Sequence, residues 1–548
     1  MIQRLFLTGM SGAGKSTIGK MVADALEWRF VDMDDVIEER SGRSIPAIFA
    51  EDGEPVFRAL EANLLAELLG GNDVVIATGG GAVCNDVARA AMNASESTLS
   101  AWLAADPEEL LARVLAHTDE DRTTHRPMLD ADDQLARMSA LINARTDYYG
   151  AADVTIPVGN RSADRTASDL VELVNLANGI PSEVVLTTEN AVSRIRIGRG
   201  IADTVADVIA TNWPKAQAVW VGVDAGMSAV NQPYLESLRS SLDIPVHIYE
   251  IPRGETSKSL ERYGEMLGWM LTAGVERGDV AIALGGGVVG DLIGFVAATV
   301  LRGIGLIQIP TTLLSMVDSS VGGKTGINHA TGKNLIGAFY QPPVVLVDPR
   351  FLQTLPEREF RSGFGEIVKH GVIQASTPNG EPGFLAEVVR LNAANLLAKR
   401  EPAMSWVIRQ NIALKANVVA ADERESGVRQ YLNFGHTIGH GVEAADYKLL
   451  HGEAVAVGMC AAMALTVARD EIDATYRDRL VEVITTYGLP TVSATTPEAV
   501  LQKMRSDKKK QAGKQNWVLP VREGGVAVTN TVTDAQIEIA LQSILREE

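Results

Sequence analysis

Short apolar runs recur along the chain. Each is followed by a polar or glycine-rich turn, and several of these turns lead into a stretch with the character of a helix. The runs with this pattern occupy residues 3–8, 29–31, 74–77, 219–223, 246–251 and 281–284. Strands that alternate with helices predict parallel sheets, which bind ligands at the carboxyl ends of their strands.

After Leu355 the pattern changes to apolar residues at helical spacing. Glu366, Lys369 and His370 then stand at positions i, i+3 and i+4 and share one face of the expected helix. The chain is therefore predicted to be an α/β protein. A parallel-sheet domain comes first, a Rossmann-like α/β domain follows, and a mostly α-helical domain ends the chain.

A break rich in glycine and proline separates the first domain from the rest. Residues 170–177 have the character of a last helix, and Asn178-Gly179-Ile180-Pro181-Ser182 stops it before the next apolar run. A chain of 548 residues is too long for one hydrophobic core. The expected division is 1–175, a linker at 176–183, and domains at 184–350 and 351–548.

Composition limits the classes of function. With 46% hydrophobic and 22% charged residues, the chain has the make-up of a folded globular protein. Its net charge of −19 argues against nucleic acid as a partner, because a phosphate-binding surface needs a basic stripe. Cys84 and Cys460 are too few for a disulfide framework or a cysteine-type zinc site. No signal-peptide layout and no uninterrupted apolar run of about 18 residues is found, so a cytoplasmic protein without a membrane partner is expected.

A phosphate-binding loop follows the first apolar run. The sequence Gly9-Met-Ser-Gly-Ala-Gly14-Lys15-Ser16-Thr17 has the full pattern between a predicted strand and a predicted helix. Its backbone N–H groups would surround phosphate oxygens, Lys15 would reach the β- and γ-phosphates, and Ser16 would bind Mg²⁺. The residues expected to bind ATP in this loop are Gly12, Ala13, Gly14, Lys15, Ser16 and Thr17. A chance glycine-rich turn is the alternative, and the loop alone also admits an adenylate kinase, a gluconate kinase or a GTPase.

Two carboxylates close the second apolar run. Strand alternation sends Asp32 and Asp34 to the same side, so that one can lie near Mg²⁺ and the other over an acceptor hydroxyl. A solvated acidic loop would give a similar pattern.

These features together resemble shikimate kinase over about residues 1–170. That family pairs the phosphate loop with an Asp-x-Asp, a Phe-Arg-x-x-Glu, a triple-glycine turn, an Arg-Pro-Leu-like lid and a late arginine. The corresponding residues are Asp32 and Asp34, Phe57 to Glu61, Gly79 to Gly81, Arg126-Pro127-Met128-Leu129, and Arg145.

The resemblance implies roles for these residues. Asp34 would hold the shikimate hydroxyls and act as the base, and Asp32 would support Mg²⁺ beside Ser16. Arg58 and Arg145 would clamp the shikimate carboxylate, with Gly80 also in contact. Arg126, on the lid, would stabilise the transferring phosphoryl group, with Arg122 near ATP.

Glycines and basic residues are dense between Gly285 and Asn334. The run Gly285-Gly-Gly-Val-Val-Gly290-Asp291 predicts a nucleotide site after its strand, although a tight structural turn would look alike. Further on, the residues that stand out are Arg302, Pro310-Thr311-Thr312, Asp318, Gly322-Gly323-Lys324 and Gly332-Lys333-Asn334. A solvated face would carry fewer glycines.

Three of the eight histidines lie between Tyr431 and Glu453: His436, His440 and His451. Such crowding predicts a metal site, with a satisfied helix face as the alternative. By spacing alone, His436 and His440 form the ligand pair, with Glu366 or Glu443 as the third ligand.

Residues 183–548 are similar to 3-dehydroquinate synthase. The motifs that carry the similarity are 285–291, 318–324, 332–334, Gly365-Glu-Ile-Val-Lys369, Asn433-Phe-Gly-His436-Thr-Ile-Gly-His440 and His451-Gly-Glu453. The similarity assigns Glu366, His436 and His451 to a zinc or cobalt ion and leaves His440 to the substrate. Synthases of this kind often dimerise, so a homodimer through this half is a further expectation.

The similarity also assigns the cofactor and substrate contacts. Those implied for NAD⁺ are Asp224, Glu255, Lys258, Gly286, Gly287, Asp291, Thr311, Thr312, Lys324, Lys333 and Thr354. Those implied for 3-deoxy-arabino-heptulosonate 7-phosphate are Arg302, Asp318, Lys324, Asn334, Lys369, Lys415, Arg429, Asn433, His440 and Lys508. Lys324, Lys369, Lys415, Arg429 and His440 are the catalytic members of this set. One position departs from the family, because Gly226 stands where an asparagine is frequent.

The expected function is a bifunctional enzyme of aromatic biosynthesis that uses ATP with Mg²⁺, NAD⁺, and Zn²⁺ or Co²⁺. It would phosphorylate shikimate and cyclise the heptulosonate phosphate with loss of phosphate. Alternative functions for residues 183–548 are those of a sister sugar-phosphate cyclase and of a metal-dependent polyol dehydrogenase. A regulatory protein with inactive modules is a third rival, disfavoured by the intact Lys15, Asp34, Glu366, His436 and His451.

Overall fold

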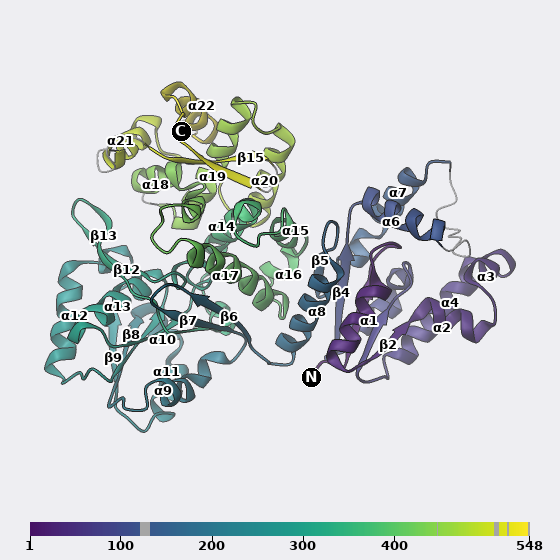
Figure 1. The fold of residues 1–548 in the computed structure, drawn as a ribbon, viewed down its shortest axis with the longest axis horizontal. Helices are drawn as coiled ribbons and strands as arrows, with labels where there is room; N and C mark the ends of the chain where they lie inside the picture. Colours follow the sequence, from purple (N-terminus) through teal and green to yellow (C-terminus); the bar gives the residue numbers. More distant parts are fainter. Residues whose placement is uncertain (121–131, 447, 509–514, 523–524, 546–548) are drawn as a thin grey trace. The chain divides into compact units, whose positions relative to one another are not determined.

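The computed structural model describes residues 1–548 except 121–131, 447, 509–514, 523–524 and 546–548. Two compact units make up the chain (Figure 1). The first contains residues 1–180 and 394–406, and the second contains residues 181–393 and 407–548. The predicted separation of 184–350 from 351–548 stays a prediction, since both parts, apart from residues 394–406, fall within the second unit.

A five-stranded parallel sheet forms the centre of the first unit, in the order β2-β3-β1-β4-β5. Its strands are β1 (Arg4–Thr8), β2 (Arg29–Asp32), β3 (Val74–Ala77), β4 (Thr98–Ala104) and β5 (Val154–Pro157). Its helices are α1 (Lys15–Leu26), α2 (Met33–Ser41), α3 (Ile45–Glu51), α4 (Glu54–Leu68), α5 (Asp86–Asn93), α6 (Pro107–Glu120), α7 (Gln134–Tyr149) and α8 (Ala163–Ala177). Because β1, β2 and β3 are parallel neighbours, the turns after them lie at one edge of the sheet.

The second unit contains a seven-stranded sheet in the order β6-β7-β14-β11-β10-β8-β9. All neighbours are parallel except β6 and β7. Its strands are β6 (Ser182–Thr187), β7 (Val192–Ile197), β8 (Val219–Asp224), β9 (Val246–Ile251), β10 (Val280–Gly285), β11 (Gly305–Pro310) and β14 (Val344–Val347). Helices among these strands are α9 (Val205–Asn212), α10 (Ala225–Val230), α11 (Gln232–Ser240), α12 (Leu260–Thr272) and α13 (Gly287–Thr299). The hairpin of β12 (Lys324–His329) and β13 (Gly332–Phe339) follows β11.

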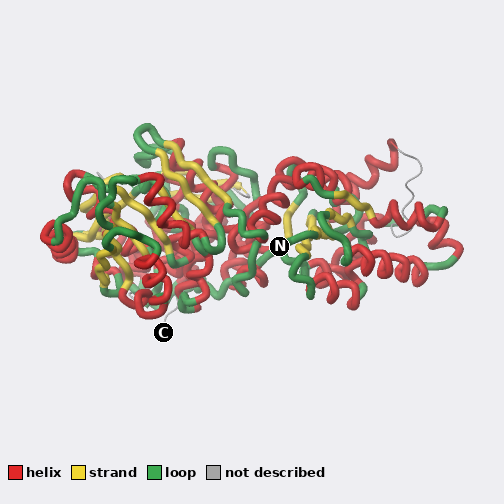
Figure 2. Tube along the Cα trace, turned by 90° about the horizontal axis from the view of Figure 1, so that it is seen from below, coloured by secondary structure: helices red, strands yellow, loops and turns green. Residues whose placement is uncertain are grey.

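Helices dominate the remainder of the second unit. They are α14 (Glu357–Ile373), α15 (Phe384–Leu391), α17 (Ala403–Ala421), α18 (His436–Ala445), α19 (His451–Ala468), α20 (Ala474–Thr486), α21 (Pro497–Lys508) and α22 (Asp534–Ile544). The short α16 (Ala393–Leu397) precedes α17, and residues 394–406, which hold most of α16 and the start of α17, belong to the first unit. A hairpin of β15 (Trp517–Arg522) and β16 (Gly525–Thr529) precedes α22. Figure 2 shows the strands in yellow with the helices around them. All six apolar runs form strands, and the predicted α/β architecture with a helical end is confirmed.

One helix among the described residues, α19, is long and apolar enough to cross a membrane by length and composition. Its mean hydropathy is 1.4, and 78% of it is buried within the structure. That burial is the pattern of a core helix.

Candidate active sites

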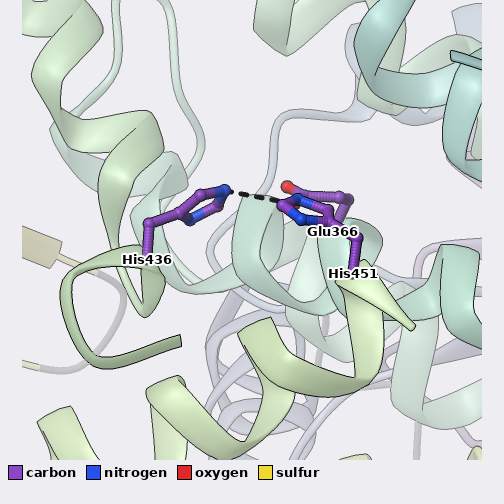
Figure 3. Close-up of side chains that lie close together, drawn as sticks. All are labelled: Glu366, His436 and His451. Atoms are coloured by element: carbon purple, nitrogen blue, oxygen red, sulfur yellow. Dashed lines mark ion pairs between the residues drawn. The ribbon is translucent and has the colours of Figure 1, made fainter. Parts of the chain in front are cut away.

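Three side chains from separate helices converge in the second unit (Figure 3). Glu366 lies in the middle of α14, His436 begins α18 and His451 begins α19. The Nε2 atoms of His436 and His451 each lie 3.4 Å from Oε1 of Glu366. Glu366 is fully buried, and among the described residues no donor meets hydrogen-bond geometry at its Oε1. Two imidazole nitrogens and one carboxylate are a donor set that suits Zn²⁺ or Co²⁺.

The other nitrogen of each ring is held by a neighbour. Nδ1 of His436 lies 3.1 Å from the carbonyl oxygen of Phe434, and Nδ1 of His451 lies 3.4 Å from Oε2 of Glu443. A donated N–H on Nδ1 leaves Nε2 of each ring as the ligand atom. Burial lowers the pKa of His451, but the carboxylates of Glu366 and Glu443 outweigh it and raise that pKa to about 10. A divalent cation that binds here therefore displaces a proton.

His440 lies near this cluster but belongs to a different group of potential ligands. It is exposed and stands with Glu443 and His451, whereas Glu366 stands with His436 and His451. The ring centres of His436 and His440 are 5.1 Å apart. Although His436 and His440 are one helical turn apart, they thus do not belong to the same group of potential metal ligands.

A buried cluster of charges surrounds Asp318. Lys415 Nζ donates to Oδ1 of Asp318 at 2.7 Å and to its backbone oxygen at 2.6 Å, and Lys369 Nζ lies 4.0 Å from Oδ1. Lys369 and Lys415 are 1% and 6% exposed. Burial would raise the pKa of Asp318, but Lys415 above all holds it well below its usual range. Asp318 therefore stays charged, holds the ammonium group of Lys415 and lies near that of Lys369.

Glu425 is a site residue that the sequence did not single out. It forms an ion pair with Lys324 and accepts a hydrogen bond of 2.8 Å from Nδ2 of Asn433. Arg429, 2% exposed, donates to the carbonyl oxygen of Gly322 at 3.1 Å. Glu425 thus joins two of the predicted substrate contacts, and it could be found only from contacts distant in sequence.

The residues predicted to bind NAD⁺ cluster at the carboxyl edge of the seven-stranded sheet. Lys258, 4% exposed, forms an ion pair of 2.6 Å with Asp291 and also contacts Asn334. Burial raises the pKa of Asp291, and Lys258 opposes that shift. The others at this edge are Asp224, Glu255, Gly286, Gly287, Thr311, Thr312 and Thr354. A cavity of about 420 Å³ lies beside them, lined by Asp291, Lys324, Asn334 and further residues of the β12–β13 hairpin.

Three predicted residues of this unit stand apart from these contacts. Lys333 pairs with Glu443 at 3.0 Å, so it reaches the metal-site partner of His451. Arg302 is exposed, with a φ of 70°, and the structure gives it no ion pair with a described residue. Lys508 ends α21, and its side chain is not among those described.

In the first unit the phosphate loop joins β1 to α1. Lys15 Nζ donates to the carbonyl oxygens of Gly9 and Met10 at 2.9 and 3.0 Å. The hydroxyl of Ser16 donates to Oδ2 of Asp32 at 2.5 Å. The two oxygens expected at Mg²⁺ are therefore adjacent, as a shared cation requires.

The triple-glycine turn after β3 gathers the residues expected at shikimate. Arg145 Nη1 donates to the carbonyl oxygen of Gly80 at 3.1 Å. A Cβ at Gly81 would lie 2.4 Å from Nη1 of Arg58, so a larger residue there would force that guanidinium to move. Arg58 forms an ion pair with Glu61, which is 2% exposed. Arg122 and Arg126 lie outside the described residues.

Glu61 belongs to the Phe-Arg-x-x-Glu motif but was not among the predicted site residues. Its Oε1 is buried, and among the described residues no donor is bonded to it. Burial raises the pKa of Glu61, and Arg58 opposes that shift. The motif spacing of three residues, one helical turn, is the signal that could have identified it.

Family models match both units. The model for shikimate kinase matches residues 11–175, and the models for the N-terminal and C-terminal parts of 3-dehydroquinate synthase match 248–362 and 363–510. The chain is 46% identical to the 3-dehydroquinate synthase of Acidithiobacillus ferrooxidans over 318 residues, which are 57% of this chain and 85% of that one.

Two solved structures are similar to the second unit. One is the 2-epi-5-epi-valiolone synthase ValA of Streptomyces hygroscopicus subsp. jinggangensis with NAD⁺ and Zn²⁺, with a TM-score of 0.58 and 28% identity over 66% of this chain and 98% of that one. The other is a 2-deoxy-scyllo-inosose synthase with carbaglucose-6-phosphate, NAD⁺ and Co²⁺, with a TM-score of 0.59 and 25% identity over 66% of this chain and all of that one.

Proposed function

The chain belongs to the 3-dehydroquinate synthase family and carries a shikimate kinase domain ahead of it, and we propose which of its side chains bind the substrates, metal ions and cofactor of each reaction. It is a kinase and a lyase of the shikimate pathway. The convergence of Glu366, His436 and His451 carries the synthase assignment.

In the kinase unit, Lys15 binds the phosphates of ATP and the adjacent Ser16 and Asp32 hold Mg²⁺, which neutralises charge on the β- and γ-phosphates. Arg58 and Arg145 bind the carboxylate of shikimate from two sides of the glycine turn. Asp34 lies in the first turn of α2, just after Asp32, and not on the strand that alternation predicted. In this proposal it accepts the proton of the attacking hydroxyl.

In the synthase unit, Glu366, His436 and His451 hold Zn²⁺ or Co²⁺, and NAD⁺ occupies the carboxyl edge of the sheet. Bound there, the metal would supply Lewis acidity toward a sugar hydroxyl, and NAD⁺ would supply a hydride acceptor that is regenerated, so that no net oxidation would result. Lys369 and Lys415, fixed by Asp318, place positive charge beside the reacting hydroxyl.

The phosphate and carboxylate of the substrate require further cations, and this unit supplies them. Lys324 and Asn433, joined by Glu425, bind the phosphate, and Arg429 binds the carboxylate. Arg302, Asn334, His440 and Lys508 complete the proposed substrate contacts.

The decisive experiment measures phosphate release from 3-deoxy-arabino-heptulosonate 7-phosphate by metal-loaded protein with trace NAD⁺, while absorbance follows NADH. Release far beyond the NAD⁺ supplied, with no build-up of NADH, supports the internal redox cycle. Net NADH would indicate a dehydrogenase. Turnover of a different heptulose phosphate would indicate a sister cyclase like the two structural relatives, although identity to the synthase relative is higher.

We further propose that the synthase unit forms a homodimer and that the protein is cytoplasmic. The exposed apolar side chains of Leu335 and Phe339 on β13 support a contact surface on that unit. Sedimentation at a series of protein concentrations measures the oligomeric state, and a mass of 58.6 kDa at all of them would contradict the dimer.

A further inference from the structure

An arginine fills the space left by Gly226 in the synthase unit. Arg253 lies in the loop after β9, and Gly226 lies at the start of α10, just after β8. A Cβ placed on Gly226 would lie 2.7 Å from both Cδ and Nε of Arg253 and 3.0 Å from Cζ. The guanidinium therefore stands where the side chain of a larger residue at position 226 would stand.

Asp224 lies directly beside this guanidinium. Its Oδ1 accepts the backbone N–H groups of Gly226 and Met227 at 2.9 and 3.1 Å, and Nε of Arg253 lies 3.6 Å from the same oxygen. Among the described residues no donor is bonded to Oδ2 of Asp224. That oxygen remains for a ligand hydroxyl, with a positive charge beside it.

The pair lies at the part of the sheet where a dinucleotide places its adenosine. β8 and β10 are parallel neighbours in which Val223 pairs with Leu284, so Asp224 ends next to the glycine turn that begins at Gly285. In such sheets an acidic residue near the glycine turn binds the adenine ribose of NAD⁺, and an arginine there accommodates the 2′-phosphate of NADP⁺. This chain has both side chains.

We propose that Arg253 completes the adenosine end of the dinucleotide site in place of a side chain at 226, and that its guanidinium reduces discrimination against NADP⁺. The inference rests on the proposed function of this unit. Asp224 alone would repel a 2′-phosphate. The guanidinium offsets that repulsion and has a planar set of N–H donors that suits two phosphate oxygens. Its side chain is 62% exposed, so the group can turn from Asp224 to a phosphate without unpacking the core.

Calorimetric titration of the full, metal-loaded chain with NAD⁺ and with NADP⁺ tests this, with the Kd ratio of NADP⁺ to NAD⁺ as the readout. Arg253→Ala should raise the ratio about threefold to fivefold, the effect of one solvent-exposed charged contact. Gly226→Asn should raise it as well, because the added side chain displaces the guanidinium. Arg277→Ala is the matched control, since it removes an exposed arginine from the turn before β10, at the opposite edge of the sheet.

The outcomes distinguish a failure of the role proposed for Arg253 from a failure of the proposed NAD⁺ site. If the unaltered chain does not bind NAD⁺, the proposed dinucleotide site is wrong, and so is the role proposed for Arg253. If NAD⁺ binds but neither Arg253→Ala nor Gly226→Asn changes the ratio, only the inference is wrong. An equal rise in Arg277→Ala would also overturn it, because net charge and not the placement of Arg253 would then set the preference.

Discussion

Lys369 forms an ion pair with Glu366, one helical turn away, although both side chains are buried. A carboxylate removed from water needs a compensating charge, and here an ammonium group and two imidazoles supply it. Burial alone would raise the pKa of Glu366, but its partners, Lys369 foremost, outweigh burial and hold that pKa well below its usual range. The carboxylate is thus kept ionised, as a metal ligand must be.

Lys369→Met should therefore destabilise the metal-free synthase unit by about 3 kcal/mol, because the variant buries the Glu366 charge without its nearest partner. Zn²⁺ should recover more stability in the variant than in the unaltered chain, since the cation replaces the lost charge. Urea unfolding with and without Zn²⁺ measures both effects.

The control for this variant is Arg390→Ala, which breaks an ion pair with Glu387 at the same i, i+3 spacing. That pair is 46% and 42% exposed, so its loss should cost under about 1 kcal/mol. Equal costs for the two variants would show that burial of the Lys369 pair does not govern stability.

Lys15→Ala and His451→Ala should separate the two activities. The first removes the ammonium group expected at the phosphates and should lower shikimate phosphorylation at least about a hundredfold while phosphate release by the synthase persists. The second removes a metal ligand and should have the reverse effect. Loss of both activities in either folded variant would contradict two independent catalytic units.

The sequence pattern found strands where apolar runs lead into a polar or glycine-rich turn, but it did not single out β4. That strand buries Thr98 and Ser100. The hydroxyl of Ser100 donates to Asp153 at 2.8 Å, and the two residues are 53 positions apart. A polar residue in the sequence favours a loop, and only its distant hydrogen-bond partner explains why it is buried in a strand. No local sequence pattern identifies that partner.

The same limit applied to the sites. Helical spacing placed His436 and His440 on one helix face, but only the packing of α14, α18 and α19 brings His451 to Glu366. Glu425 lies in an acidic stretch typical of a solvated surface, and its contact with Lys324 spans 101 positions. Motifs that fold locally, such as the phosphate loop, were readable. Pairs joined across the fold could not be derived from spacing: the family resemblance supplied Glu366 with His451, and nothing in the sequence paired Glu425 with Lys324.

The buried His370 should make the synthase unit less stable at acidic pH. It is fully buried, its Nδ1 lies 3.1 Å from Oδ1 of Asn411, and burial foremost lowers its pKa to about 3. The unfolded chain binds a proton near pH 6.5 while the folded chain does not, so stability falls as pH drops from about 6.5 toward 3. The slope from this group is at most about 1.4 kcal/mol per pH unit.

Urea unfolding of metal-free protein at pH 7.5, 6.5, 5.5 and 4.5 measures that slope. His370→Gln keeps a donor for Asn411 but cannot titrate, so its stability should fall less between pH 6.5 and 4.5. An identical pH dependence in the two proteins would show that His370 is not the group responsible.

Glu61 and Glu54 both bind Arg58 and offer a matched pair for the kinase site. Glu61 is 2% exposed and lies one helical turn after Arg58, whereas Glu54 is 50% exposed and pairs with Arg58 at 2.9 Å. We expect Glu61 to position Arg58, because a buried charged contact restricts a guanidinium far more than an exposed one. Glu61→Gln should therefore raise the KM for shikimate about tenfold, with a smaller effect on kcat and on the KM for ATP.

Glu54→Gln should change the KM for shikimate less than about threefold, because water competes for its contact with Arg58. Initial rates with varied shikimate and varied ATP give the three constants for each variant. If Glu61→Gln lowers kcat and leaves the KM for shikimate unchanged, Glu61 acts on the chemical step and not on the position of Arg58. Equal KM effects in the two variants would mean that burial of Glu61 does not distinguish the two contacts.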